Sequence, residues 1–377
     1  MTANSPTQET SLTDQAVAWL QTRLPGGWEI EASDFQAEQD QLRADARINL
    51  RGPNGTISTV IVEEKQSVSP RSVLSQLSPR IKTARSMGAH LPLLVIAPWL
   101  SERTQELLAK EDINYLDLTG NAQLRIDNPP FFMQTTGAQR NPSPPKRAGA
   151  KLRGAKASRV IRLLLDVHPP YGVLEITEAT GLNRGYVSRL LEALYRDGLI
   201  ERKPRGPVES VDVPALVRRW VESYDTFRTN GAEGFIVAAG LERLLTRLAA
   251  DPGLGTRAVI TGSFAANRLA PIASPALLLL YYDSPQLLAA ELDLLPAQEG
   301  ANVMILKPFD PVVFDRTRIE EGLRYAAPSQ IAVDCLGGNG RMPAEGEALL
   351  EWMAAEESSW RLSSLEDLSG EQGSDLR

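Results

Sequence analysis

Cysteine and histidine are scarce in this sequence of 377 residues, which has one Cys and two His. A single cysteine, Cys335, excludes an internal disulfide and a cysteine-rich zinc site, and its apolar setting "IAVDCLGG" predicts a buried side chain. His90 and His168 have no second His or Cys at metal-ligand spacing. We therefore expect His90 in a loop and His168 at a helix end, neither of them in a metal or catalytic site.

Long hydrophobic runs are also missing. No stretch approaches the roughly eighteen consecutive apolar residues that a membrane helix needs. The N-terminal "MTANSPTQETSLTDQ" has neither the basic start nor the apolar segment of a signal peptide. A composition of 42% hydrophobic and 23% charged residues is typical of soluble globular proteins with two or three domains at this length. The sequence therefore predicts a cytoplasmic protein with no membrane partner.

Positive charge is concentrated in one part of an acidic chain. Residues 140–205 contain fourteen Arg and Lys against six Asp and Glu, whereas the whole chain has a net charge of −7. A local basic field within an acidic protein is typical of a module that binds a polyanion such as nucleic acid. The alternative is an ordinary solvated face.

Composition and periodicity divide the chain into parts. The segment "GAQRNPSPPKRAGAKLRGAKAS" is rich in Pro, Gly and basic residues and has no helical or strand period, as expected of a linker or arm. On both sides of the central module, helical and strand patterns alternate, which predicts sheets covered by helices. The predicted parts are an α/β domain (10–138), a basic linker (139–156), a winged helix-turn-helix (157–230), a second α/β domain (231–355) and a mobile tail (356–377).

The central module has the pattern of a winged helix-turn-helix. Helices are predicted over 157–167 and 173–180, and a third follows the turn at Gly181. In the third helix an apolar stripe at i, i+3, i+4 and i+7 faces a small core, and Asn183 is placed to cap its first turn. The following "GLIERKPRGPVESVDV" predicts a hairpin with a basic tip. The stripe consists of Val187, Leu190, Leu191 and Leu194.

This geometry assigns DNA-contacting roles by position. Residues near the start of the third helix can reach base edges in a major groove, whereas later and wing residues are better placed for phosphate. Basic residues of the arm are expected at the DNA backbone or minor groove. The predicted base-contacting residues are Asn183, Arg184 and Tyr186. The predicted phosphate contacts are Ser188, Arg189, Lys203 and Arg205. Further DNA-binding residues are predicted at Arg196 and Arg202 and, in the arm, at Lys151, Arg153 and Lys156. A protein-binding role for the same face stays open.

Asp45, Glu63 and Lys65 form a second constellation. Glu63 and Lys65 in "TVIVEEKQ" share one face of a strand, and Asp45 in "RADARINL" lies on a neighbouring strand. Two carboxylates and a lysine could hold Mg²⁺ and activate water for phosphodiester hydrolysis. The order of helices and strands resembles the restriction-endonuclease-like PD-(D/E)xK fold. The alternatives are a metal-dependent nuclease, with Asp45 and Glu63 as metal ligands, and a sheet edge whose charges discourage strand addition.

Two further motifs point towards structure rather than catalysis. In "INYLDLTGNAQL", a strand ending at Asp117 is followed by "TGN", which predicts a tight turn, with a phosphate-binding loop as the alternative. In "AVITGSFAANRLAP", Gly262 and Ser263 follow a strand as in nucleotidyltransferases. Tyr281 occupies the position where a carboxylate partner of Asp283 would be needed, so we expect a catalytically silent domain.

Taken together, the motifs resemble AbiEi-type regulators, the antitoxins of type IV toxin-antitoxin systems. The resemblance is carried by "YLDLTGNAQL", "LRGAKASRVIRLLLD", "GYVSRLLEAL", "ITGSFAANRLAP", "GANVMILKPFDPVVFDRT" and "GLRYAAPSQIAVD". It implies a winged-helix repressor that binds double-stranded DNA at its own promoter. It also implies a nucleotidyltransferase-like toxin that is countered without a stable complex. No cofactor is expected, Mg²⁺ belonging only to the nuclease alternative, and whether a homodimer forms stays open.

Overall fold

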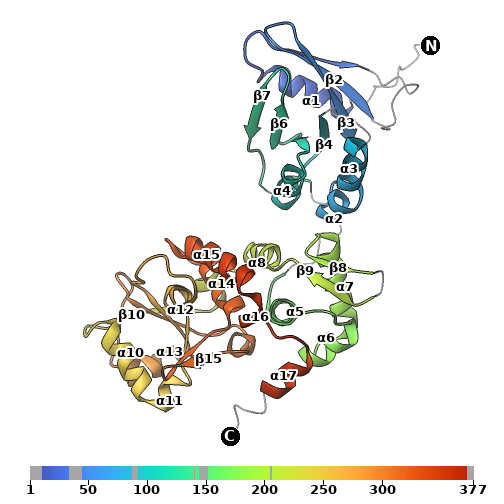
Figure 1. Cartoon of the computed structure of the whole chain (residues 1–377). Coiled ribbons are helices and arrows are strands. Elements are labelled where there is room, and N and C mark those ends of the chain that lie inside the picture. The colour runs from blue at the N-terminus through green and yellow to red at the C-terminus, as the bar shows by residue number, and fades with distance from the viewer. Residues whose placement is uncertain are drawn as a thin grey trace, which may run out of the picture. The chain divides into compact units, whose positions relative to one another are not determined.

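The computed structural model describes residues 11–33, 45–86, 92–139, 141–143, 152–203 and 206–371 (Figure 1). The chain divides into two compact units, one comprising residues 1–148 and 196–198 and the other residues 149–195 and 199–377. Within the described ranges, no helix has the length and apolar character required to cross a membrane.

The first unit is built on a seven-stranded sheet with the strands in sequence order. Its central strands β3, β4 and β5 are parallel, and the outer pairs on both sides are antiparallel. The strands are β1 (Glu29–Ser33), β2 (Ala46–Arg51), β3 (Ile57–Glu64), β4 (Leu93–Ala97), β5 (Asn114–Asp117), β6 (Ala122–Ile126) and β7 (Phe131–Thr135). The helical segments are α1 (Leu12–Gln21), α2 (Pro70–Ser72), the π-helical η1 (Val73–Leu77), α3 (Ser78–Ser86) and α4 (Glu102–Lys110).

Two hydrophobic clusters occupy the two faces of this sheet. Leu20 of α1 packs in a cluster with Val62 and Ile96, and Leu108 of α4 packs in another with Val95. Because side chains alternate along a strand, consecutive residues Val95 and Ile96 serve opposite faces, and a strand buried on both faces reads as a continuous apolar run. The predicted helix-covered α/β domain is confirmed, whereas the restriction-endonuclease-like fold stays a prediction.

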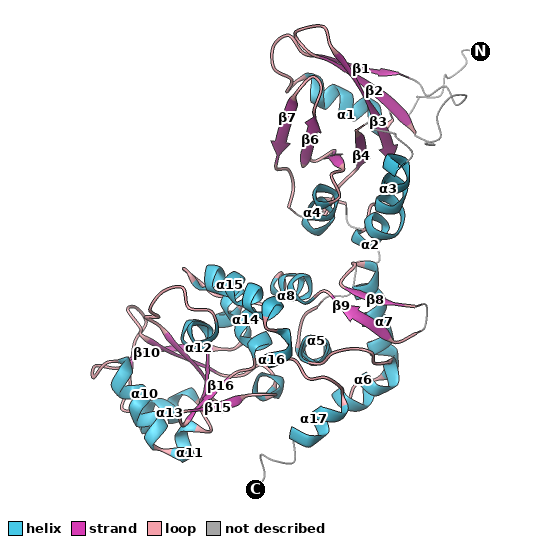
Figure 2. Ribbon diagram, viewed as in Figure 1, coloured by secondary structure: helices cyan, strands magenta, loops and turns pink. Residues whose placement is uncertain are grey.

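The second unit begins with the predicted three helices and hairpin (Figure 2). They are α5 (Ala155–Asp166), α6 (Val173–Thr180), α7 (Arg184–Arg196), β8 (Ile200–Arg202) and β9 (Val208–Val211). Two helices follow, α8 (Val213–Val221) and α9 (Thr226–Thr229). β8 and β9 pair antiparallel, as a wing requires.

A second seven-stranded sheet completes this unit, in the order β13-β10-β14-β12-β11-β16-β15. Its strands are β10 (Ala232–Ile236), β11 (Val259–Thr261), β12 (Leu278–Tyr281), β13 (Leu295–Pro296), β14 (Val303–Leu306), β15 (Arg318–Glu320) and β16 (Leu323–Tyr325). The helices are α10 (Leu241–Ala250), α11 (Pro252–Gly255), α12 (Gly262–Leu269), α13 (Pro285–Glu291), the 3-10 helix η2 (Pro311–Phe314), α14 (Pro328–Leu336), α15 (Met342–Ala355), α16 (Glu357–Trp360) and α17 (Glu366–Glu371).

The winged helix and the C-terminal sheet share one hydrophobic core, and this differs from the predicted division near residue 230. A single cluster of buried residues runs from Leu152 through Trp220 to Trp360. Helix α8, expected to lie at a boundary, contacts α5 as well as α14 and α15. Its apolar residues are therefore shared between the two parts. The module of three helices and a hairpin is therefore an integral part of the second unit.

The expectation of a mobile tail over 356–377 is wrong for its first part. Trp360 is 1% exposed and donates its indole N–H to the Met353 carbonyl at 2.9 Å. Arg361 donates to the carbonyls of Leu164 and Val167, each at 3.0 Å, and the N–H of Leu362 donates to the Asp166 carbonyl at 2.8 Å. These bonds satisfy carbonyls at the end of α5. Residues 372–377 lie outside the described ranges.

Candidate nucleic-acid interface

The turn before α7 has the features that its sequence predicts. Helix α6 ends at Gly181 with φ of 65°, a left-handed conformation that glycine adopts without steric penalty. Two residues later, the Oδ1 atom of Asn183 accepts a hydrogen bond from the N–H of Gly185 at 2.8 Å. Asn183 therefore caps α7, which fixes the direction in which the helix leaves the turn.

A buried stripe holds α7 in a fixed rotation. The exposed fraction is 2% or less for each of the four predicted stripe residues, Val187, Leu190, Leu191 and Leu194. All four belong to the shared core of the second unit. Because i, i+3, i+4 and i+7 lie on one side of a helix, the opposite side, which carries Arg184, Ser188 and Arg189, faces outward. The stripe prediction is confirmed.

The outward face of α7 carries the residues predicted for DNA contact. Arg184, Ser188 and Arg189 are exposed, as is Arg196, whose Nε lies 3.8 Å from the Asp197 carboxylate. Tyr186 is only half-buried at the edge of the core, and this burial raises the pKa of its phenol. The face therefore offers guanidinium and hydroxyl donors on a rigid helix, as recognition helices do in a major groove. Their contacts with DNA remain a prediction.

In the wing, one predicted residue is placed differently from expectation. Arg202 is buried, with 8% of its surface exposed, and on β8 it shares a face with buried Ile200 because strand side chains alternate. It is therefore not an exposed cation of the wing tip. Lys203 is exposed, and its Nζ lies 3.5 Å from the Glu209 carboxylate. The predicted Arg205 lies outside the described residues.

The basic arm is held where it joins α5. Leu152 is buried, and its carbonyl accepts a hydrogen bond from the Ser223 hydroxyl at 3.0 Å. Arg153 and Lys156 on either side of the α5 start are exposed. Lys151 lies outside the described residues. Two of the three predicted arm cations are thus available to a ligand beside the module.

Two other cations of the basic segment bond to groups in the C-terminal part of the same unit. Arg159 forms an ion pair of 2.8 Å with Asp310, which is 5% exposed. Arg162 is 1% exposed and donates to the Asp166 carboxylate at 2.9 Å and to Gln330 Oε1 at 3.0 Å. Their charge is neutralised internally. The positive field available to a polyanion is therefore smaller than the count over residues 140–205 indicates.

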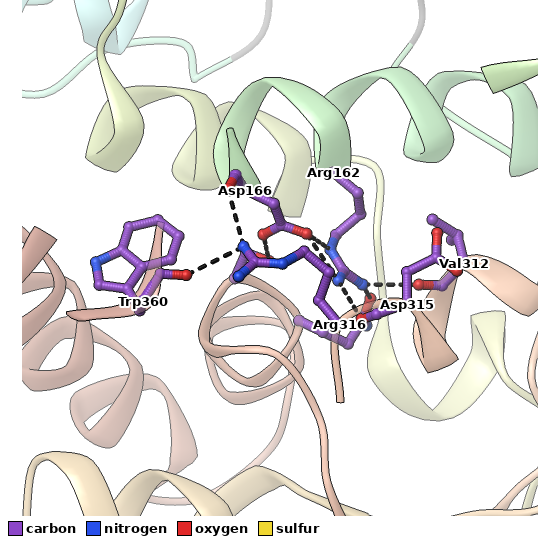
Figure 3. A network of polar contacts seen from close by, with 8 residues as sticks. Arg162, Asp166, Val312, Asp315, Arg316 and Trp360 are labelled. Carbon is purple, nitrogen blue, oxygen red and sulfur yellow. Dashed lines mark hydrogen bonds and ion pairs between the residues drawn. The ribbon is translucent and has the colours of Figure 1, made fainter. Parts of the chain in front are cut away.

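Figure 3 shows this buried network around Arg162 and Asp166 at the end of α5. Arg162 also donates to the carbonyls of Val312 and Asp315, each at 2.9 Å. Arg316 donates to the carbonyls of Asp166 at 2.9 Å and Trp360 at 3.1 Å. Sequence reasoning did not assign these residues, although an Arg–Asp pair at i, i+4 within the apolar "RVIRLLLDV" was a usable signal.

The predicted nuclease residues are partly brought together. Glu63 is 5% exposed, and its Oε1 lies 2.6 Å from Lys65 Nζ and 2.9 Å from Arg80 Nη1. The Asp45 carboxylate instead accepts the N–H of Glu64 at 2.8 Å. Among the described residues, no group of three or more His, Cys, Asp or Glu side chains could hold a metal ion. The nuclease alternative gains no support from this arrangement.

The polar residues of the "TGN" turn and of the C-terminal motif "AVITGSFAANRLAP" form hydrogen bonds with other residues of the same unit. The Asp117 carboxylate accepts hydrogen bonds from the N–H groups of Leu100, Thr119 and Asn121 at 2.8–3.1 Å, so the loop closes on itself as a tight turn. Ser263 donates to the buried Glu345 carboxylate at 2.5 Å. In the same unit, Tyr281 donates to Asp334 at 2.8 Å.

Residues 155–204 match the sequence model of the IclR helix-turn-helix domain. No curated protein and no solved structure matches the chain. The matched range covers α5, α6, α7 and the first strand of the wing, which are the elements that build the exposed face described above. The chain therefore contains a helix-turn-helix DNA-binding domain, and this supports a DNA-binding transcriptional regulator.

Proposed function

We propose that this chain is a sequence-specific transcriptional regulator that represses its own promoter and acts as an AbiEi-like antitoxin. The observation that carries the DNA-binding part is the coincidence of the helix-turn-helix match with an outward, cation-bearing face on a core-anchored helix. The start of such a helix presents donors to base edges, while later residues of the helix and the wing lie near phosphates.

The exposed cations among the described residues determine how strongly DNA affinity should depend on salt concentration. Arg159, Arg162 and Arg202 are excluded because they are paired or buried. The other described cations of the segment 140–205 are all exposed, and they are Arg153, Lys156, Arg184, Arg189, Arg196 and Lys203. Neutralising about six phosphates lowers affinity on the order of a thousandfold between about 50 and 200 mM salt. A merely solvated face gives no such dependence.

Asn183 and Arg184 are proposed to read bases. The amide oxygen of Asn183 caps α7. A substitution that removes the cap would therefore change the start of the helix as well as any base contact, and the two effects could not be separated. Asn183→Ser keeps an oxygen acceptor for the cap and removes the amide that could pair with a base. It is therefore the sharper test of base reading.

The experiment uses the full chain and a labelled duplex from upstream of its own gene. Footprinting locates the site, and binding to a library of single-base variants measures preference. We expect Arg184→Ala and Asn183→Ser to change which bases are preferred by about 1–3 kcal/mol at one or two positions. Arg228→Ala, at a side chain that is 91% exposed in α9, is the matched control and should change nothing. Absence of any footprint on this duplex would refute autorepression.

The antitoxin role and its toxin partner are the finer part of the proposal. They are supported by the resemblance of the ordered motifs to AbiEi-type regulators. Co-expression with the nucleotidyltransferase-like gene nearest to this one tests the role. Growth rescued by the wild-type chain supports it, and toxicity unrelieved by a chain that still binds its operator contradicts it.

A further inference from the structure

The outward side of α7 carries one acidic residue among its cations. Glu192 is the only Asp or Glu in this helix, and its side chain is exposed. Ser188 and Arg189 lie one turn before it and Arg196 one turn after it, and all three are exposed. A carboxylate therefore lies in the middle of the face that meets DNA in the proposed function.

The helix period places Glu192 where a recognition helix reads bases. Gly185, Ser188, Arg189 and Glu192 follow one another at i, i+3, i+4 and i+7, the same spacing as the buried stripe on the other side. Homeodomains read base edges in the major groove from helix positions with this spacing. Glu192 therefore lies within the two helical turns that can reach base edges.

The carboxylate of Glu192 is not neutralised by the neighbouring arginines. In the described part of the chain, the side chains of Glu192 and Arg189 form no hydrogen bond or ion pair. Arg189 extends instead towards the start of the helix, since its Nη1 atom lies 3.4 Å from the position that a Cβ on Gly185 would occupy. Arg196 has its Nε atom 3.8 Å from the Asp197 carboxylate. The carboxylate of Glu192 is thus free to accept hydrogen bonds from a ligand.

The chemistry of the major groove limits what a carboxylate can bind there. An ionised carboxylate only accepts hydrogen bonds, so phosphates and the acceptor atoms of guanine and thymine repel it. The donors on base edges are the N4 amino group of cytosine and the N6 amino group of adenine, and adenine places the acceptor N7 beside its amino group. Cytosine is therefore the base that a single carboxylate prefers.

We propose that Glu192 is a specificity-determining residue that accepts a hydrogen bond from the N4 amino group of one cytosine in the operator. A guanine or thymine at the same position offers it only acceptors, so the carboxylate contributes to discrimination rather than to overall affinity. This inference rests on the proposed DNA-binding function and adds a C·G base pair to the target of α7.

Glu192→Gln is the decisive variant because glutamine keeps the shape of the side chain and changes its hydrogen bonding. Its amide both accepts and donates, which suits the N7 and N6 atoms of adenine. The full chain is tested against the library of single-base operator variants. We expect the preferred base at one position to change from cytosine to adenine, with a change in relative Kd of at least about fivefold.

Two further variants separate base reading from a general charge effect. Glu192→Ala should lose the preference at that same position and should bind a duplex of unrelated sequence more tightly than the wild type does, because a negative charge is removed. Glu242→Gln, the same change at an exposed glutamate of α10, should keep the wild-type preference at every position.

The outcomes distinguish this inference from the proposed function. If the wild type binds its operator specifically and Glu192→Gln prefers the same base at every position, the inference is overturned and the proposed function stands. A change in affinity that is equal for all operator variants would also overturn it, because Glu192 would then act only through its charge. A wild-type chain that binds every duplex equally would overturn the proposed function together with this inference.

Discussion

Removing Arg162 tests whether the winged helix and the C-terminal sheet are held together by the buried network. The guanidinium makes hydrogen bonds to the Asp166 carboxylate, Gln330 and two backbone carbonyls, and the residue is 1% exposed. Arg162→Met keeps much of the apolar stem and removes all of these donors. Asp166 then remains as a buried carboxylate without its cationic partner.

The expected loss follows from that orphaned charge. Breaking a buried ion pair by removing one partner lowers the free energy of unfolding by about 3–5 kcal/mol. The double variant Arg162→Met/Asp166→Leu removes both charges of the pair, so we expect it to recover at least half of the loss. Arg228→Met at a nearly fully exposed position should change the free energy by less than about 0.5 kcal/mol.

Urea unfolding followed by hydrogen exchange and mass spectrometry measures these differences unit by unit. Peptides from α5 and α14 report on the second unit, and peptides from β3 and β4 provide an internal reference within the first. A loss below about 1 kcal/mol in Arg162→Met would refute the reasoning. So would a double variant that is as unstable as the single one, because the orphaned Asp166 would then not be the cause.

Three further predictions concern the core, the C-terminal segment and the wing. Burial raises the pKa of Asp334 from 3.8 to about 6, so the folded state holds its proton more tightly than the unfolded state. The stability advantage of the wild type over Asp334→Asn should therefore shrink by about 2 kcal/mol as pH rises from 4 to 6 in denaturant titrations, and a constant difference would contradict this. Trp360→Ala should lower the free energy of unfolding of the second unit by about 3–5 kcal/mol, whereas a mobile tail would give almost no loss. Lys203→Gln should reduce the salt slope of DNA binding by about 1, and Arg202→Gln should leave that slope unchanged because Arg202 is buried; equal effects would show the wing is misassigned.

The winged helix could be predicted because its signals are local. Gly181 in the turn, the cap at Asn183 and the apolar stripe of α7 each depend on residues within a few positions of one another. The match of residues 155–204 to a helix-turn-helix family agrees with that interpretation. Local sequence patterns were therefore sufficient to predict the helices of this module and the outward face of α7.

The errors arose where partners are distant in sequence. Arg162 looked like one more cation of a basic segment, but its partners Val312 and Gln330 lie 150 and 168 residues further along the chain. Trp360 stands in a polar segment without a sustained period, so only its tertiary contacts reveal that it is anchored. For Arg202, alternation from buried Ile200 was a usable local signal for an inward side chain.

The salt dependence of DNA binding tests the central claim most directly. The claim is that exposed cations on α7, the wing and the arm contact duplex phosphates, while Arg159 is neutralised by Asp310. We predict a slope of log affinity against log salt near −5 for the full chain, reduced in magnitude by about 1 in Arg189→Ala and unchanged in Arg159→Gln. A slope near zero, or a larger change for Arg159→Gln than for Arg189→Ala, would contradict the account.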